Sequence, residues 1–443
     1  MNNQGIKLSE GRTPKAIVPQ DIAHPVKEHY AGVIVGYYVK NTRVYNIMPN
    51  DATIDQEKVK ILGNIYDIDI IQHLTPQAKE QISFLETDID MSLTPAERLL
   101  ALKNKKKAVT EVPNVNYCVN ELNNIIHTCD NSINHDADDF LLVGYWSCNK
   151  LHLIEIATLT EVKIETYALK LDIFSRNTGI LESDIMLDKG ALFIGCGSVG
   201  SLMAVELAKA GVGRFMLIDS DTFNYHNICR HQCGIYDVGK YKTDAVAEKI
   251  LQINPYAQVI KRNMTIQEVD IDDIKAFCNK NAIIIGGADN REGDLYANQF
   301  AVSQDCAFIS IGCWERAFAG EIFYSVPSAG MPTYDDFIKA IGGLSERITQ
   351  NRRYYTTEEE LEKTNFEPGI SADINYVTII AVKMALDLLN RDNQNYTQRL
   401  IPYLTEYTLV CNTNNSKIGG ENAEIFSYPL QVTTSIKVPF ANK

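Results

Sequence analysis

A glycine-rich stretch between residues 191 and 239 restricts the fold of this chain more than any other feature. An apolar segment runs into the pattern G-x-G-x-x-G, whose glycines are Gly195, Gly197 and Gly200, and an alanine- and leucine-rich helix pattern follows. A second apolar segment, residues 214–218, then leads to Asp219. This spacing predicts a βαβ unit whose glycines permit a tight turn, close approach of a phosphate and close helix–strand packing. Because a helix N-terminus attracts anions and Asp219 can accept hydrogen bonds from a ribose, we predict a nucleotide site.

Length and composition argue against several classes of protein. A chain of 443 residues is long enough for two or three domains, and its net charge of -14 argues against nucleic acid as a partner. No uncharged apolar run reaches about 18 residues, so we expect no membrane span, and the N-terminal sequence lacks a signal-peptide pattern. The ten cysteines form no C-x-x-C pair, which argues against a four-thiolate zinc site and favours buried thiols in a reducing compartment. We therefore expect a cytoplasmic protein.

Hydrophobic patterning divides the chain into an arm and two domains. Residues 1–20 are polar with two prolines and are expected to form a flexible arm. Residues 21–170 carry strand and helix patterns typical of a smaller α+β recognition domain. Residues 171–443 alternate short apolar runs with helical segments, which predicts a Rossmann-like, doubly wound, mostly parallel α/β sheet. A polar crossover loop is expected within this domain, at about residues 327–370.

Polar residues beyond the glycine-rich turn distinguish between two kinds of nucleotide site. A dehydrogenase that transfers hydride needs no cluster of cations and carboxylates beside the phosphates. Cleavage of a triphosphate does need one, because charge accumulates on the leaving pyrophosphate. Arg230 and Lys242 can neutralise that charge, and Asp289, which follows another apolar run, can bind Mg²⁺. The sequence therefore favours ATP and Mg²⁺ over a nicotinamide cofactor.

The ordered set of motifs resembles the ThiF/MoeB superfamily of ubiquitin-activating-type, ATP-dependent adenylating enzymes. The resemblance runs from Phe174-Ser-Arg-Asn177 to about Val326. It implies a reaction that joins AMP to the C-terminal carboxylate of a ubiquitin-like protein or peptide and releases pyrophosphate.

The resemblance also implies roles for individual residues. Arg230 contacts the phosphates, Lys242 stabilises charge at the attacked phosphorus, and Asp289 is the magnesium ligand. Arg176 is implied to act in trans, in the active site of a partner subunit, and a homodimer follows from that role. The implied nucleotide-binding residues are Gly195, Gly197, Gly200, Asp219, Asp221, Asn227, Gln232 and Asn290.

Several residues depart from the superfamily pattern, and others have two alternative roles. Thr333 and Tyr334 stand where many relatives carry zinc-binding cysteines, so we expect no structural zinc. No cysteine lies between Cys313 and Cys411, which removes the usual location of a thioester nucleophile. Cys313, just after the apolar run 308–311 and close to the expected nucleotide face, is the candidate that is left, and the interpretation we favour for it is a packed core cysteine. Arg291 has two alternative roles, a phosphate contact or a surface charge.

The N-terminal domain is similar to a degenerate JAB-type metalloprotease domain. The resemblance rests on Glu28-His-Tyr-Ala-Gly32 and on residues 143–149, where Ser147 and Asn149 replace the histidines of the His-x-His zinc motif. It implies binding of a ubiquitin-like tail or a partner without zinc-dependent hydrolysis. An unrelated α+β recognition domain is the alternative.

Three functions are compatible with these patterns. The first is activation of a ubiquitin-like protein in a bacterial conjugation or modification pathway, with a conjugating enzyme as a further partner. The second is microcin-type adenylation of a peptide, which needs no catalytic cysteine. The third is a nucleotide-binding scaffold without catalysis, against which the joint presence of Arg230, Lys242 and Asp289 counts.

Overall fold

The computed structural model divides the chain into two compact units, of which the first ends at Asp172 and the second begins at Ile173. The residues that the structure describes are 13–24, 32–49, 51–53, 58–66, 141–147, 150–155, 160–287, 291–343 and 368–440.

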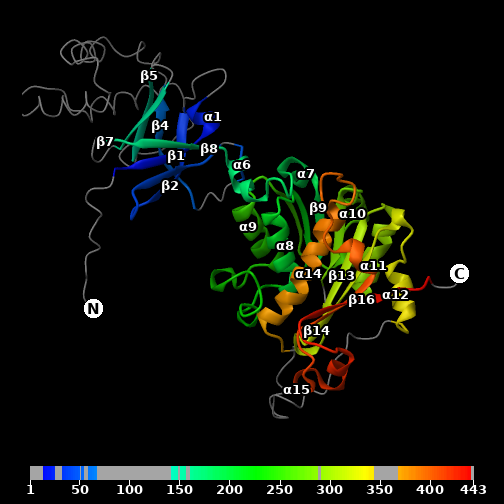
Figure 1. Ribbon diagram of the computed structural model, residues 1–443. Helices are drawn as coiled ribbons and strands as arrows, with labels where there is room; N and C mark the ends of the chain where they lie inside the picture. Colours follow the sequence, from blue (N-terminus) through cyan, green and yellow to red (C-terminus); the bar gives the residue numbers. More distant parts are fainter. Residues whose placement is uncertain are drawn as a thin grey trace, which may run out of the picture. The chain divides into compact units, whose positions relative to one another are not determined.

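The first unit is built on a mixed sheet (Figure 1). Its strand order is β7-β6-β5-β4-β2-β3-β1-β8. Alternate residues of its strands are buried, and Ile34, Tyr45, Trp146 and Leu153 form the centre of its core. The elements are β1 (Lys15–Pro19), α1 (Gln20–Ala23), β2 (Gly32–Val39), β3 (Val44–Ile47), β4 (Lys60–Tyr66), β5 (Leu142–Ser147), β6 (Lys150–Glu155), β7 (Thr160–Glu161) and β8 (Lys163–Tyr167).

Strand β1 corrects the prediction of a flexible arm through residue 20. It pairs in parallel with both β3 and β8, and Ala16 and Val18 are fully buried. The prediction failed because a short apolar run between Pro14 and Pro19 gives little local signal, whereas two neighbouring strands satisfy its backbone. Residues 1–12 lie outside the described residues. So does Asn149, one of the two positions compared with the JAB zinc motif; the other, Ser147, ends β5.

The second unit contains the predicted doubly wound α/β sheet. Its strand order is β11-β10-β9-β12-β13-β14-β15-β16, in which β9 to β13 run parallel and β14 to β16 continue antiparallel. The chain passes from β9 outward to β10 and β11 and then returns to the other side of β9 with β12. This reversal creates a switch point at the carboxyl ends of β9 and its neighbours, where ligands of such sheets bind. The strands are β9 (Gly190–Ile194), β10 (Arg214–Ile218), β11 (Gln258–Arg262), β12 (Ala282–Gly286), β13 (Ala307–Cys313), β14 (Ala319–Ser325), β15 (Tyr407–Cys411) and β16 (Gln431–Ile436).

Helices cover both faces of this sheet, which explains why its central strands are apolar along their whole length (Figure 1). Phe193 and Phe215 point to the face that packs against α8 (Ser198–Lys209), α9 (Lys242–Ile253) and α14 (Ser371–Leu389). Leu192 and Met216, one residue along each strand, point to the face with α10 (Ile271–Phe277), α11 (Arg291–Ser303) and α12 (Tyr334–Ala340). The short helices are α6 (Leu169–Ile173), η2 (Ser175–Asn177), α7 (Ser183–Asp188), η3 (Tyr225–Asn227), η4 (Ile235–Asp237), η5 (Ile266–Glu268), η6 (Glu315–Ala317), η7 (Pro327–Ala329), η9 (Ile401–Tyr403), α15 (Ser416–Gly419) and η10 (Gly420–Ile425).

Helix α12 occupies the position where relatives were expected to carry zinc-binding cysteines. Thr333 caps the helix: its hydroxyl accepts a hydrogen bond from the Asp336 amide at 3.2 Å, and Asp336 in turn accepts one from the Thr333 amide at 2.8 Å. Tyr334 is fully buried, with its ring 5.4 Å from those of Phe308 and Phe323. A capping box and an aromatic cluster therefore anchor the start of this segment. Residues 344–367 of the predicted crossover loop lie outside the described residues.

None of the helices in the described part of the chain combines the length and the apolar character that a membrane span requires.

Candidate functional site

A cavity of about 450 Å³ lies at the switch point of the second unit. Its walls come from the glycine-rich turn after β9, the segment after β10, the start of α9, the turn between β13 and β14, and the start of α14. The volume falls within the roughly 300–1,000 Å³ range of small-molecule sites. Sequence-predicted residues on its wall are Gly195, Gly197, Asp219, Asp221, Asn227, Arg230, Lys242 and Cys313.

The three glycines of the turn have different structural roles. Gly195 has a φ of +92°, a conformation that favours glycine, and its amide donates to the Ile218 carbonyl at 2.9 Å. A Cβ on Gly200 would lie 2.1 Å from the Gly195 carbonyl oxygen, so this position allows α8 to pack on the turn. Gly197, in contrast, has no atom within 4 Å of the place where its Cβ would be. Gly195 and Gly197 line the cavity, whereas Gly200 supports the turn from behind.

Asp219 is held at the cavity wall by backbone donors. One carboxylate oxygen accepts from the Cys196 amide at 2.7 Å, and the other accepts from the Asp221 amide at 2.8 Å. Since an ionised carboxylate has about four acceptor positions, each oxygen keeps capacity for a further donor such as a ribose hydroxyl. The bond from the Cys196 amide also ties the glycine-rich turn to the end of β10.

Lys242 and Asp221 form an ion pair on the same wall, with 2.6 Å between Nζ and Oδ2. The Lys242 side chain is 12% exposed and that of Asp221 is 65% exposed. The Lys242 amide also donates to the Asp221 carbonyl at 3.0 Å, which places the lysine at the first residue of α9. Asp221 therefore holds the ammonium group at the wall, a role that its position in the sequence did not reveal.

His231 lines the cavity next to Arg230 and was missed in the sequence. Its Nδ1 accepts a hydrogen bond from the Cys233 amide at 3.1 Å, so the ring proton is on Nε2, which donates to the Cys196 carbonyl at 2.7 Å. Burial lowers the pKa of His231 to about 4, so the ring is neutral near pH 7. The only signal in the sequence was its place beside a predicted phosphate contact.

Other predicted residues lie away from the cavity or outside the described residues. Gln232 does not line the cavity, because its segment packs on α8, where its amide donates to the Ser201 hydroxyl at 3.4 Å. Arg176, in η2, is exposed and is also absent from the cavity wall. Asp289 and Asn290 lie outside the described residues. In the described part of the chain, no three His, Cys, Asp or Glu side chains are grouped as a metal would require.

Arg291 has neither of the two roles considered for it. Its guanidinium is buried and pairs with the buried carboxylate of Glu321 at 2.8 Å. It also lies over the Phe337 ring, 5.6 Å from the ring centre. The first residue of α11 is thus anchored in the core instead of facing phosphate or solvent.

The turn between β13 and β14 also lines the cavity. Cys313 is partly exposed on this wall, beside Trp314, Arg316 and Ala317. Arg316 and Ala317 have φ angles of +56° and +53°, which residues with a Cβ rarely adopt. Cys196 is fully buried and burial raises the pKa of its thiol, so of these two cysteines only Cys313 offers its side chain to the cavity.

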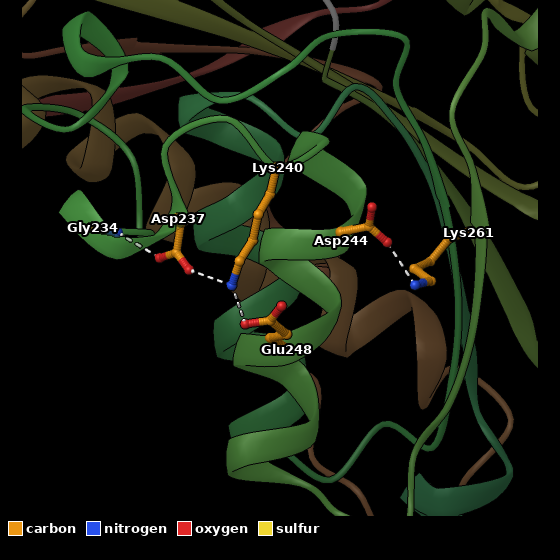
Figure 2. A network of polar contacts seen from close by, with 6 residues as sticks. All are labelled: Gly234, Asp237, Lys240, Asp244, Glu248 and Lys261. Carbon is orange, nitrogen blue, oxygen red and sulfur yellow. Dashed lines mark hydrogen bonds and ion pairs between the residues drawn. The ribbon is translucent and has the colours of Figure 1, made fainter. Parts of the chain in front are cut away.

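A second charged network near α9 is separate from this wall (Figure 2). Lys240 bridges Asp237 at 3.2 Å and Glu248 at 2.6 Å, and Lys261 pairs with Asp244 at 2.6 Å. None of these five residues lines the cavity at the switch point.

Comparison with known protein families identifies the family of this chain. The sequence profile of the ThiF family matches residues 178–417, more than half of the chain. The chain belongs to the ThiF family. The predicted superfamily is therefore confirmed, and the matched region contains every described residue of the cavity wall.

Curated relatives of this ThiF-family chain match over shorter regions. It is 28% identical over 145 residues to ubiquitin-like modifier-activating enzyme 5 of Dictyostelium discoideum, which covers 31% of this chain and 38% of that protein. It is 29% identical over 116 residues to a probable molybdopterin-synthase adenylyltransferase of Porphyra purpurea, covering 26% of this chain and 28% of that protein. The matches thus span about a third of the relatives' length.

Solved structures with a similar chain include E. coli MccB with ATP. That comparison has a TM-score of 0.42 and 17% identity and covers 58% of this chain and 66% of MccB. PaaA gives a TM-score of 0.43 and 14% identity, with 64% of this chain and 87% of PaaA covered.

Proposed function

We propose that this chain catalyses ATP-dependent adenylation of the C-terminal carboxylate of a ubiquitin-like protein or peptide. The observation that carries the proposal is the single cavity in which Gly195, Gly197 and Asp219 meet Arg230 and Lys242. Membership of the ThiF family and the relatives named as activating enzymes and adenylyltransferases support the same activity.

The proposed nucleotide pose follows from the chemistry of the wall. Asp219 accepts hydrogen bonds from the ribose, and the open space beside Gly197 admits the phosphates to the N-terminus of α8. Asn227 donates through its amide nitrogen, because its carbonyl oxygen already accepts from the Asn224 amide at 2.9 Å. Arg230 and Lys242 neutralise the phosphates. For this, Lys242 gives up its ion pair with Asp221 and pairs with phosphate oxygens instead.

The reaction balances without a general base. A carboxylate oxygen of the acceptor attacks the α-phosphorus, the bond from that phosphorus to the bridging oxygen breaks, and pyrophosphate leaves with the electron pair. Because a C-terminal carboxyl group has a pKa of about 3.5, it is already ionised at neutral pH. The neutral His231, which is hydrogen-bonded at both ring nitrogens, is therefore assigned a structural role in the wall.

Mg²⁺ is proposed to bind at Asp289, where it would neutralise phosphate charge. The support for this ligand is its position in the sequence, three residues after the end of β12 and two after Gly287, which lines the cavity, together with the preference of Mg²⁺ for carboxylate oxygens. The adjacent Asn290 is proposed as a nucleotide contact on the same basis.

The partner and assembly are further parts of the proposal. We propose a homodimer in which Arg176 acts in trans; the exposed Tyr225, Ile235 and Tyr236, of which Tyr236 is 94% exposed, supply apolar surface for such an interface. The pathway is proposed to be bacterial conjugation or modification in the cytoplasm, with a conjugating enzyme downstream. Microcin-type peptide adenylation is the second candidate, favoured by the lack of any cysteine between Cys313 and Cys411.

Partner-dependent exchange of labelled pyrophosphate into ATP tests this proposal. With small glycine-ended proteins or peptides encoded by neighbouring genes, we expect exchange, and Lys242→Ala should lower its rate by about 100- to 1,000-fold. Lys261→Ala is the matched control, because it removes an equal charge from a pair outside the cavity and should leave the rate unchanged. Asp289→Ala should abolish exchange. If the wild-type chain shows no exchange with any partner, the scaffold function replaces this proposal.

A further inference from the structure

One buried carboxylate, Glu321 of β14, joins several elements around the cavity. It is 6% exposed. One of its oxygens pairs with Arg291 at 2.8 Å, and the other accepts from the Trp314 indole nitrogen at 3.2 Å and from the Tyr407 hydroxyl at 3.0 Å. The partners come from α11, from the turn between β13 and β14, and from β15.

Two of these contacts lead directly to the cavity wall. Trp314 itself lines the cavity. Arg291 is the first residue of α11 and directly follows residues 288–290, and Gly293, one half-turn further along α11, lines the cavity as well. Glu321 does not line the cavity, so it touches the site only through these neighbours.

The buried charge of Glu321 makes the link between α11 and the turn at Trp314 rigid. Removing one member of a buried ion pair leaves the other charge uncompensated, so the structure resists separation of Arg291 from Glu321. On the other side, the turn that contains Trp314 carries Arg316 and Ala317 in the left-handed region, and such strain persists only where the surroundings enforce it. The Trp314–Glu321 hydrogen bond is one of the contacts that enforce it.

We propose that Glu321 is a positioning residue of the adenylation site, which holds the start of α11 and the turn at Trp314 at a fixed separation around the cavity. In this role it determines where the acceptor carboxylate lies relative to the α-phosphorus. The proposal rests on the proposed function for its catalytic consequence, but the positioning itself can be measured without catalysis.

The variant Glu321→Gln keeps the shape of the side chain and removes its charge. We expect kcat for pyrophosphate exchange to fall by about 10- to 100-fold, the size of effect that small misplacements cause, while the Kd for ATP stays within about threefold. Trp314 fluorescence is the second readout, since the chain has two tryptophans and Trp146, in the first unit, contributes the same background to both proteins. We expect the Trp314 emission and its response to ATP to change in the variant.

A matched control separates positioning from loss of stability. Asp387 is another fully buried carboxylate, near the C-terminus of α14, which accepts from the amides of Arg399, Leu400 and Ile401. It lies about 20 Å along the helix from Ile374, the residue of α14 on the cavity wall. Asp387→Asn should lower the Tm but leave kcat and the Trp314 emission unchanged. If Glu321→Gln behaves in the same way, the proposal is wrong.

Two further outcomes are informative. Should Glu321→Gln not fold, Trp314→Phe removes the indole donor to Glu321 together with part of the ring, and an unchanged kcat in that variant would overturn the proposal. If the wild-type chain shows no exchange with any partner, the proposed function fails alone; the positioning role is then judged by Trp314 emission, and an emission and ATP response in Glu321→Gln equal to the wild type would refute it.

Discussion

Gly197 and Gly200 lie three residues apart in one turn, yet alanine at these positions should damage different properties. At Gly200 the new Cβ would lie 2.1 Å from the Gly195 carbonyl oxygen, where ordinary contact begins at 3.4 Å. Because the obstacle is backbone, the turn or α8 must move by roughly 1 Å. Overpacking of this kind costs about 1–3 kcal/mol, and the better helix propensity of alanine returns up to about 1 kcal/mol.

We therefore expect Gly200→Ala to lower the free energy of unfolding by about 1–2 kcal/mol and the Tm by about 2–4 °C, from the per-residue unfolding entropy of a unit this size. Gly197→Ala should behave differently, because nothing lies within 4 Å of its Cβ and its φ of -76° suits alanine. Its cost at the N-cap of α8 is below about 1 kcal/mol, but its methyl group would occupy the space proposed for phosphate.

Calorimetry measures both effects. Scanning calorimetry gives the Tm of each variant, and titration with ATP gives the Kd, which for Gly197→Ala should rise at least about tenfold. A Gly200→Ala variant with wild-type Tm would refute the derived helix–turn packing. Wild-type ATP affinity in Gly197→Ala would show that phosphate does not approach this turn.

Two other predictions concern the pH dependence of stability and the cysteine of the cavity. Burial lowers the pKa of His231 to about 4. Between about pH 6.5 and 4 the unfolded chain therefore binds a proton at this residue that the folded chain does not. As the pH falls through this range, the free energy of unfolding should decrease by up to roughly 3 kcal/mol, and above this range His231 should not affect it. Urea unfolding at pH 7 and pH 4.5 measures this loss of free energy of unfolding, and the loss should be smaller in His231→Gln. An equal loss in both proteins would contradict the assignment of this pH dependence to His231. Cys313→Ala should retain pyrophosphate exchange and lose any reductant-sensitive adduct with the partner, and an adduct that persists in this variant would exclude Cys313 as the nucleophile.

The glycine-rich turn was predictable because its signals are local. The spacing of Gly195, Gly197 and Gly200 between an apolar run and a helix pattern specifies a turn geometry without reference to distant residues. Asp219 follows at the end of the next strand, and parallel pairing of β9 with β10 brings it beside the turn. The alternation of apolar runs and helices likewise predicted the doubly wound sheet that the structure contains.

Long-range contacts account for what the sequence analysis missed. Strand β1 was expected to be part of an arm, because its pairing partners β3 and β8 are distant in sequence. The burial of Arg291 depends on Glu321, 30 residues later, and the pairing of Lys242 depends on Asp221. The sequence does not reveal whether the Arg291 or Lys242 side chain faces phosphate, solvent or a buried partner.

By itself, the sequence determined the class of fold, the glycine-rich turn and the place of Asp219 after the second strand of the βαβ unit, since each depends on residue types within a few positions of one another. Only the tertiary structure decided which residues share the cavity. The antiparallel pairing of β13 and β14 creates the turn that brings Cys313 and Trp314 to the cavity wall, and α14 contributes Ile374. The physical reason is that side-chain position across a sheet is determined by strand order and burial, which are properties of the whole folded unit.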